Sequence, residues 1–406
     1  MKRIGILAAG VCAAAFGANL FAAAPKAAAP APIANYWMDV ATTSGFGAGM
    51  MGGGGRPNMG QIMQMMNGGG GSVGHTLDLR LASKTKPASA AQADHWVPAG
   101  LQMGPSLPLV TPVREIAPPA PTGMPTNYQP KGRMLIYWGC GEHVAAGQPT
   151  VIDFSKVAKG QVPPGMAAMA NMAKVVSGPH SAPGFGHWPN DRDSRAVPAS
   201  GSLLGAHKVA GNYSPDIAFS LGSGLDFMPG LGLREAGALP SGASRLTWTP
   251  AAQATGYALA MFGANGSGDV VMWSSSNKGG MAMLDYVAPA EAKRLVAAGA
   301  VLPPTANQCI LPAEVAAAVP AGMVTMIGYG PEANFSDDPK TPKWTAKIRY
   351  KTTASVMRGM SGMMGGAAEA DDNAVPQQQQ QQQQPRKKKR FGIGDLLGGV
   401  PVPGGR

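Results

Sequence analysis

The sequence predicts a mostly β protein of two β-sandwich-like domains, with a few short helices, long Gly/Pro-rich loops and a disordered C-terminal tail. The chain holds 57 Gly and 37 Pro in 406 residues, a composition that disfavours long helices. Short runs of β-branched and aromatic residues recur between turn signals, as in strands. The chain is also long enough for two domains that each bury a core.

The first predicted element is a secretory signal peptide over residues 1–24. Lys2 and Arg3 give it a positive start, Ile4 to Ala18 an apolar core, and Ala22 to Ala24 a cleavage site of the A-x-A type. This core is too short for a permanent transmembrane helix, and no later stretch reaches the roughly 18 apolar residues that a span needs. We therefore expect an exported bacterial protein, periplasmic or associated with the cell envelope, with no transmembrane segment in the mature chain.

The first domain is predicted over residues 35–212, after an Ala/Pro linker at 25–34. Its expected strands are 36–42, 75–81, 133–138 and 150–154. We expect the first two strands to pair across a disordered Met/Gly-rich insertion at 44–74. A Pro-rich stretch at 104–131 is expected to run over the surface, a helix is expected between about 165 and 176, and 177–212 reads as loop.

The second domain is predicted over residues 213–356. Its expected strands are 216–221, 225–228, 245–250, 256–262, 269–274, 322–329 and 343–350. The sequence Asn265-Gly266-Ser267-Gly268 is typical of a hairpin turn. Residues 289–299 are predicted as a short helix, because Pro stands near their start and Gly at their end.

Part of this second domain carries a recognisable pattern. Leu246-Thr247-Trp248-Thr249-Pro250 is followed by Ala254-Thr255-Gly256-Tyr257 and by a late strand from Trp344 to Tyr350. Residues 215–355 thereby resemble a fibronectin type III or immunoglobulin-like β-sandwich. The resemblance implies that the early Trp and the following Tyr pack between two sheets, and it implies a binding or scaffolding role. The helix at 289–299 and the Pro-rich stretch 303–320 depart from the pattern.

The tail over residues 357–406 is predicted to be disordered, because it offers too little apolar surface to offset chain entropy. It contains eight glutamines and a basic run, Arg386, Lys387, Lys388, Lys389 and Arg390. Of the net charge of +11, this run supplies five and the start of the signal peptide two, which leaves +4 for the rest. Such a body is not suited to specific nucleic-acid binding. The run itself is interpreted either as a tether to an anionic envelope surface or as a solubilising tail.

Two cysteines, Cys140 and Cys309, remain after export. In an oxidising compartment they are candidates for a disulfide that closes a loop of roughly 170 residues. The alternative is two separate buried thiols.

Methionines suggest a possible metal site. Met59, Met63, Met65 and Met66 lie in the flexible insertion, and thioether sulfur suits Cu(I), with His75 and His95 near enough in sequence to assist. A smaller cluster at Met357, Met360, Met363 and Met364 has the same composition. Low-complexity filler is the alternative interpretation. A further set, His180, His187 and Asp191, has a spacing that also suits a metal, although loop histidines are usually only solvated.

Catalytic motifs are weak throughout. Cys140, Glu142 and His143, with His187, are the most plausible centre of a hydrolase, although neighbours in the chain seldom form a triad. The chain contains no H-E-x-x-H or P-loop sequence. We therefore expect a non-catalytic binding or structural protein of the envelope without a cofactor, with an anionic surface or another envelope protein as partner. The alternatives are a periplasmic copper-binding protein and a hydrolase.

Overall fold

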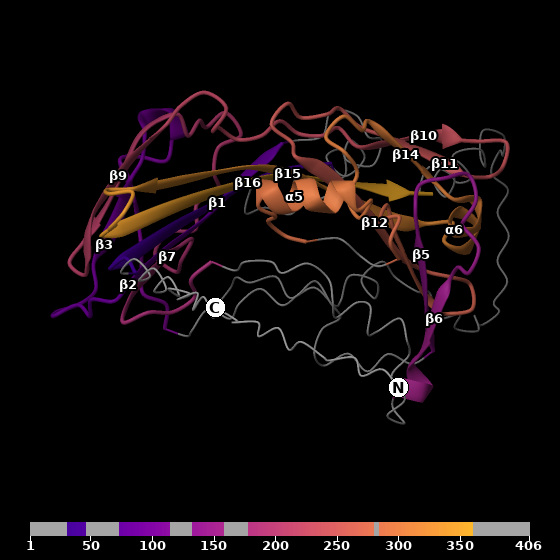
Figure 1. Ribbon diagram of the computed structural model, residues 1–406, viewed down its shortest axis with the longest axis horizontal. Helices are drawn as coiled ribbons and strands as arrows, with labels where there is room; N and C mark the ends of the chain where they lie inside the picture. Colours follow the sequence, from indigo (N-terminus) through magenta and orange to yellow (C-terminus); the bar gives the residue numbers. More distant parts are fainter. Residues whose placement is uncertain (1–30, 46–72, 114–131, 158–177, 280–283, 360–406) are drawn as a thin grey trace, which may run out of the picture.

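The computed structural model describes residues 31–45, 73–113, 132–157, 178–279 and 284–359. The described chain is mostly β, as the composition predicts. Its main element is a long sheet of nine strands, which runs along the molecule (Figure 1). The strand order is β6 (Thr150–Asp153), β5 (Arg133–Trp138), β13 (Val270–Ser274), β12 (Gly256–Ala264), β15 (Gly322–Ser336), β16 (Trp344–Arg358), β1 (Ala34–Gly45), β2 (Gly74–Ser83) and β7 (Gly184–Trp188).

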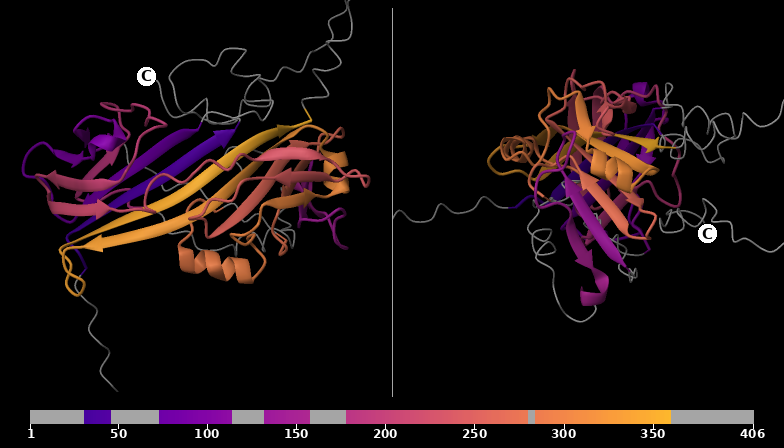
Figure 2. Two further views of the ribbon diagram at one scale, coloured as in Figure 1. Left: turned by 90° about the horizontal axis from the view of Figure 1, so that it is seen from above. Right: turned by 90° about the vertical axis from the view of Figure 1, so that its right-hand side faces the viewer.

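Two smaller sheets lie towards opposite ends of this long sheet, and the 15-residue strands β15 and β16 extend between them (Figures 1 and 2). One small sheet has the order β4 (Ser106–Pro108), β3 (Ala93–Trp96), β8 (Gly205–Gly211) and β9 (Ser214–Leu221). The other has the order β10 (Arg234–Ala238), β11 (Ser244–Thr247) and β14 (Gln308–Leu311). The described helices are short: η1 (Ala99–Leu101), α3 (Phe154–Val157), α5 (Pro289–Ala297) and α6 (Ala313–Ala318).

One apolar core lies between the long sheet and the two small sheets. Alternation places Tyr36, Met38 and Val40 of β1 on its inner face, where they join residues of both small sheets in one buried cluster. The opposite, outer face carries α5, whose Ala292 and Leu295 pack in a separate cluster that includes Ala258 of β12. The long sheet therefore has one face in the main core and an outer face that α5 covers only in part (Figure 2).

Several local expectations are confirmed. Strands β1 and β2 pair antiparallel, as expected across the insertion at 44–74. The Asn265–Gly268 segment joins the antiparallel pair β12 and β13. Helix α5 begins at the predicted Pro289. Trp248 and Tyr257 meet edge to face in the core with ring centroids 5.7 Å apart, whereas the resemblance to a fibronectin type III fold stays a prediction.

The strands do not follow the predicted separation at residue 212. The long sheet takes β1, β2, β5, β6 and β7 from one side of that position and β12, β13, β15 and β16 from the other. The strands nearest the two ends of the described chain, β1 and β16, pair in parallel at its centre. Pairing therefore joins the two predicted domains in one sheet.

One predicted strand and one predicted loop are wrong within the described chain. Residues 225–228, predicted as a strand, have no strand structure, and 177–212, predicted as loop, contain β7 and β8. The glycines of β7 explain the second error. A Cβ on Gly184 or Gly186 would collide with the Tyr213 side chain, so this strand needs glycine for close packing rather than for a turn.

Several predictions concern residues outside the described ranges. These are the signal peptide at 1–24, the linker except its last residues, most of the insertion at 44–74, the helix at 165–176 and the tail beyond residue 359. In the ranges that are described, the helices are all too short or too polar to cross a bilayer.

Candidate functional site: an exposed tryptophan surface above a buried histidine pair

The hydrolase centre predicted around Cys140 is wrong. A disulfide joins Cys140 to Cys309, so no thiol is available as a nucleophile. His143 Nδ1 lies 2.9 Å from a carboxylate oxygen of Glu314 near one end of the long sheet. His187 belongs to β7, the edge strand at the other end. Of the two alternatives left open for these cysteines, the structure therefore has the disulfide and not two separate thiols.

The predicted metal sites find no support in the described residues. Met59, Met63, Met65 and Met66 lie outside them, as does the basic run 386–390. His75 stacks on Phe227 with ring centroids 3.8 Å apart, and His95 is buried in the core. Within the ranges described here, no three His, Cys, Asp or Glu side chains, including His180, His187 and Asp191, gather in a geometry that could hold a metal ion.

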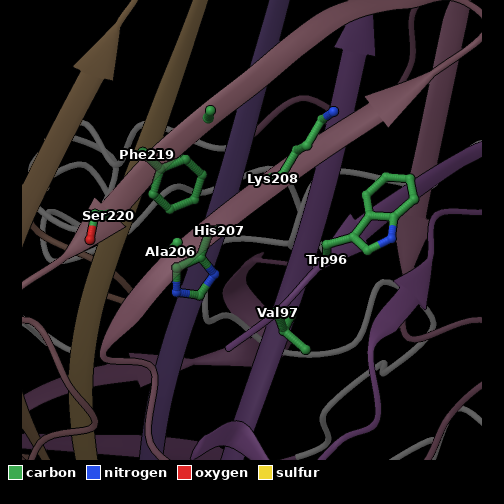
Figure 3. Close-up of a pocket in the computed structure, with 8 residues that line it drawn as sticks. Trp96, Val97, Ala206, His207, Lys208, Phe219 and Ser220 are labelled. Atoms are coloured by element: carbon green, nitrogen blue, oxygen red, sulfur yellow. The ribbon is translucent and has the colours of Figure 1, made fainter. Parts of the chain in front are cut away.

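A pocket of about 600 Å³ lies on the four-stranded sheet, at the surface formed by β3, β8 and β9 (Figure 3). Trp96 of β3 is 42 % exposed, although large aromatic side chains are usually buried. Its cross-strand neighbour on β8 is Lys208, which stands opposite Ala218 of β9. In Figure 3, Trp96 and Ser220 lie on opposite sides of the view with Lys208 between them. We call these outward-facing residues, together with Ala206, the Trp96 surface.

Small side chains give the Trp96 surface its shape. Ala206 and Ala218 are exposed positions on neighbouring strands, so a shallow hollow remains between the indole of Trp96 and the hydroxyl of Ser220. The lining residues are mostly apolar, with Lys208 as the charged member. Small-molecule sites are typically enclosed clefts, whereas this open hollow would leave much of a ligand in contact with water, so it suits a ligand that lies along the surface. The surface offers one flat apolar ring and a few polar groups, and it contains no paired acid and base.

A chain of hydrogen bonds lies beneath this surface. His207 also lines the pocket. Its Nε2 atom hydrogen-bonds to the carbonyl oxygen of Leu203 over 2.7 Å, and its Nδ1 atom hydrogen-bonds to Nε2 of His95 over 3.0 Å. His95 Nδ1 lies 2.8 Å from the hydroxyl of Tyr36 on β1. The chain therefore connects the four-stranded sheet to the long sheet through groups that are almost fully buried.

Burial sets the charge of both histidines. The pKa of His95 is held well below its usual value, first because burial disfavours the imidazolium and then because His207 is close. Burial also lowers the pKa of His207, although the Leu203 carbonyl partly offsets this effect. Both rings are thus neutral at pH 7, and each has a nitrogen that donates and one that accepts. The pair acts as a fixed polar support under the Trp96 surface.

A second cluster of charged groups occupies the outer face of the long sheet. Arg349 of β16 donates from Nε to Oδ1 of Asp39 over 2.6 Å, and its guanidinium lies between the rings of Trp37 and Tyr286 at 4.6 and 4.5 Å. Burial raises the pKa of Asp39, and Arg349 offsets only part of that effect. These groups pair with one another, and removal of one partner would leave the other charge buried and uncompensated.

The neighbouring strand extends this cluster. Asp78 of β2 accepts from Arg80 and also pairs with His187 Nε2 at 3.2 Å. Burial alone would raise the pKa of Asp78, but the hydrogen bonds from His187 and Arg80 outweigh it and lower that pKa. His187, predicted as a metal ligand or catalytic group, is therefore held within the sheet by its hydrogen bond with Asp78.

The Trp96 surface was not predicted. The segment Ala93-Asp94-His95-Trp96 places Ala93 and His95 inward and Asp94 and Trp96 outward. Each face thus carries one apolar and one polar residue, so the sequence shows no alternation that would indicate this strand. Which of its faces meets the core depends on the sheet to which β3 belongs.

Comparison with known proteins adds no relative. No protein-family model matches this chain, and no curated protein matches it in sequence.

Proposed function

We propose that this chain is an exported, non-catalytic binding protein of the bacterial cell envelope, and that it binds through the Trp96 surface. The observation that carries the proposal is the pocket at that surface, where the indole of Trp96 is exposed. The residue before it in the strand, His95, points to the opposite face and is buried and hydrogen-bonded in the core. Tryptophan is enriched at interfaces, because its large ring buries apolar area while its N–H can still find a hydrogen-bond partner.

Two further observations support the proposal. The disulfide between Cys140 and Cys309 fits an oxidising compartment, and so agrees with the signal peptide expected at residues 1–24. Of the residues considered for catalysis, Cys140 is in a disulfide, and His143 and His187 each contact a carboxylate in different parts of the fold. Attachment through the basic run 386–390 is a separate part of the proposal, because its attraction to an anionic surface is electrostatic and weakened by salt.

The test is co-sedimentation of the mature protein with isolated bacterial envelopes at low and high salt. Three variants are compared with the wild type: Trp96→Ala, a truncation of residues 376–406, and Phe262→Ala. Phe262 is the matched control, since it is an aromatic residue of β12 with 40 % exposure outside the Trp96 surface. We expect truncation to remove the salt-sensitive part of binding and Trp96→Ala to remove the salt-resistant part, with Phe262→Ala unchanged. Equal binding by wild type and Trp96→Ala at high salt would refute the role of the surface.

Location is tested in cells. The mature protein should fractionate with periplasm or envelope, with its leader removed. Recovery of the uncleaved chain in the cytosol would contradict export, whatever the binding assay shows.

A further inference from the structure

We propose that the ligand of the Trp96 surface is a neutral carbohydrate, bound with one pyranose ring stacked on the indole of Trp96. This inference rests on the proposed function and names the chemical class of ligand. It is carried by three features of the surface: its flat apolar ring, its balance of charge, and its arrangement of donors and acceptors.

The shape of the surface favours a flat ligand. Trp96 is the large exposed aromatic residue among the residues that line the pocket, because Phe219 is 7 % exposed. Ala206 and Ala218 keep two outward positions of β8 and β9 small, so the hollow beside Lys208 stays open to the rest of a ligand whose ring lies on the indole. The face of a pyranose that carries axial C–H groups is apolar and of similar extent to an indole, and stacking it there removes both apolar faces from water.

The charges of the surface argue against an anionic ligand. Lys208 Nζ lies 2.8 Å from Oδ2 of Asp216, two residues before Ala218 on the same face of β9. Asp94, two residues before Trp96 on β3, adds a second carboxylate. Nucleic acids and acidic glycans need an excess of positive charge at their site, and this surface has none.

A proline-rich peptide is disfavoured because such peptides dock in grooves lined by several aromatic side chains, whereas the described lining here offers one exposed aromatic ring.

Donors and acceptors beside the ring suit sugar hydroxyls. The side chains of Lys208 and Asp216 are 53 % and 64 % exposed, so both can bond to a ligand while they remain paired. Two neighbouring hydroxyl groups of a sugar can accept from the ammonium and donate to the carboxylate, because these two groups lie only 2.8 Å apart. Ser220 donates its hydroxyl proton to the carbonyl oxygen of Gly205 over 3.2 Å, which leaves its oxygen as an acceptor at the far side of the pocket.

The experiment measures binding of the full mature protein to defined sugars. The probes are neutral hexasaccharides of glucose and of N-acetylglucosamine, with a polyuronate, a single-stranded oligonucleotide and an oligolysine as competing classes, and the readouts are calorimetry and affinity electrophoresis. The shallow site should bind a neutral oligosaccharide weakly, with an affinity that changes little between low and high salt. Trp96→Ala should weaken that binding at least tenfold, whereas Trp96→Tyr should retain most of it.

Matched controls separate stacking from general damage. Phe262→Ala should bind like the wild type, and Lys208→Met should weaken binding less than Trp96→Ala, because it removes one polar contact and leaves the ring. Preferential binding of the polyuronate, oligonucleotide or oligolysine would overturn the proposal in favour of that class. Absence of neutral-sugar binding while Trp96 still controls envelope binding would refute the carbohydrate class and leave the proposed function intact. Loss of both would refute both.

Discussion

The disulfide between Cys140 and Cys309 allows the most direct test of how this fold is held together. Cys140 follows β5 of the long sheet, and Cys309 lies in β14 of the three-stranded sheet. The bond therefore links two sheets and closes a loop with a sequence separation of 169. In the chain-entropy model, a loop of this length restricts the unfolded chain enough to stabilise the fold by about 5 kcal/mol.

The perturbation is the double variant Cys140→Ala, Cys309→Ala in the mature protein. The expected loss is about 5 kcal/mol from the loop, with about 1 kcal/mol more because Cys309 is 2 % exposed and its sulfur leaves a small cavity. Backbone hydrogen bonds close to the bond, such as Gly141 N to Ile310 O at 3.0 Å, should keep the native contact in place without the covalent link. The folded state should therefore remain similar while its stability falls.

The assay is urea unfolding followed by circular dichroism, with and without a reductant. With a slope of about 3 kcal/mol/M, the midpoint should fall by about 2 M in the variant. Wild type in reductant should approach the variant, and the variant itself should not respond to reductant. A loss below about 1 kcal/mol, or an equal effect of reductant on both proteins, would refute the argument that this bond restricts the unfolded chain.

Three further perturbations test the core. Replacing Asp39 by Ala should cost about 3–5 kcal/mol in urea unfolding, because it leaves Arg349 with a charge that is only 10 % exposed and without its carboxylate. The pKa values of His207 and His95 are lower in the folded state, so the unfolded chain takes up protons first as the pH falls. The free energy of unfolding should therefore be greatest above about pH 6.5 and should fall on acidification by up to about 1.4 kcal/mol per pH unit for each ring. Thermal unfolding at several pH values measures this loss. Gly45→Ala should lower the free energy of unfolding by at least about 2 kcal/mol, because Gly45 has φ of +79° and its added Cβ would collide with the carbonyl oxygen of Ser355.

Each of these perturbations has a matched control. Asp216→Ala breaks an exposed ion pair and should cost less than about 1 kcal/mol, so an equal loss for Asp39→Ala would contradict the role of burial. His143→Gln, at an exposed histidine, should leave the acid sensitivity unchanged, whereas a stability that does not fall below pH 6.5 would contradict the buried neutral pair. Gly222→Ala places a Cβ in open space, and it should be tolerated where Gly45→Ala is not.

Local features of this fold follow from the sequence. Alternation of apolar and polar residues places β2 close to its true bounds, and runs of apolar, aromatic and β-branched residues do the same for β1, β5 and β12. Turn residues at Asn265–Gly268 and the proline that opens α5 mark connections that depend only on the neighbouring backbone. The export expectation and the candidate disulfide come from equally local patterns and from a count of cysteines.

Tertiary structure alone decided how the strands assemble and which side chains face water. The sheet forms because β16 pairs in parallel with β1 about 310 positions earlier, and no local pattern states which distant strand edges will meet. The same limit applies to the tryptophans: Trp96 is 42 % exposed, whereas Trp188 and Trp273 are buried, although all three lie in strands. Exposure depends on which face of a strand another layer covers, and that is a property of the assembled sheets rather than of any segment.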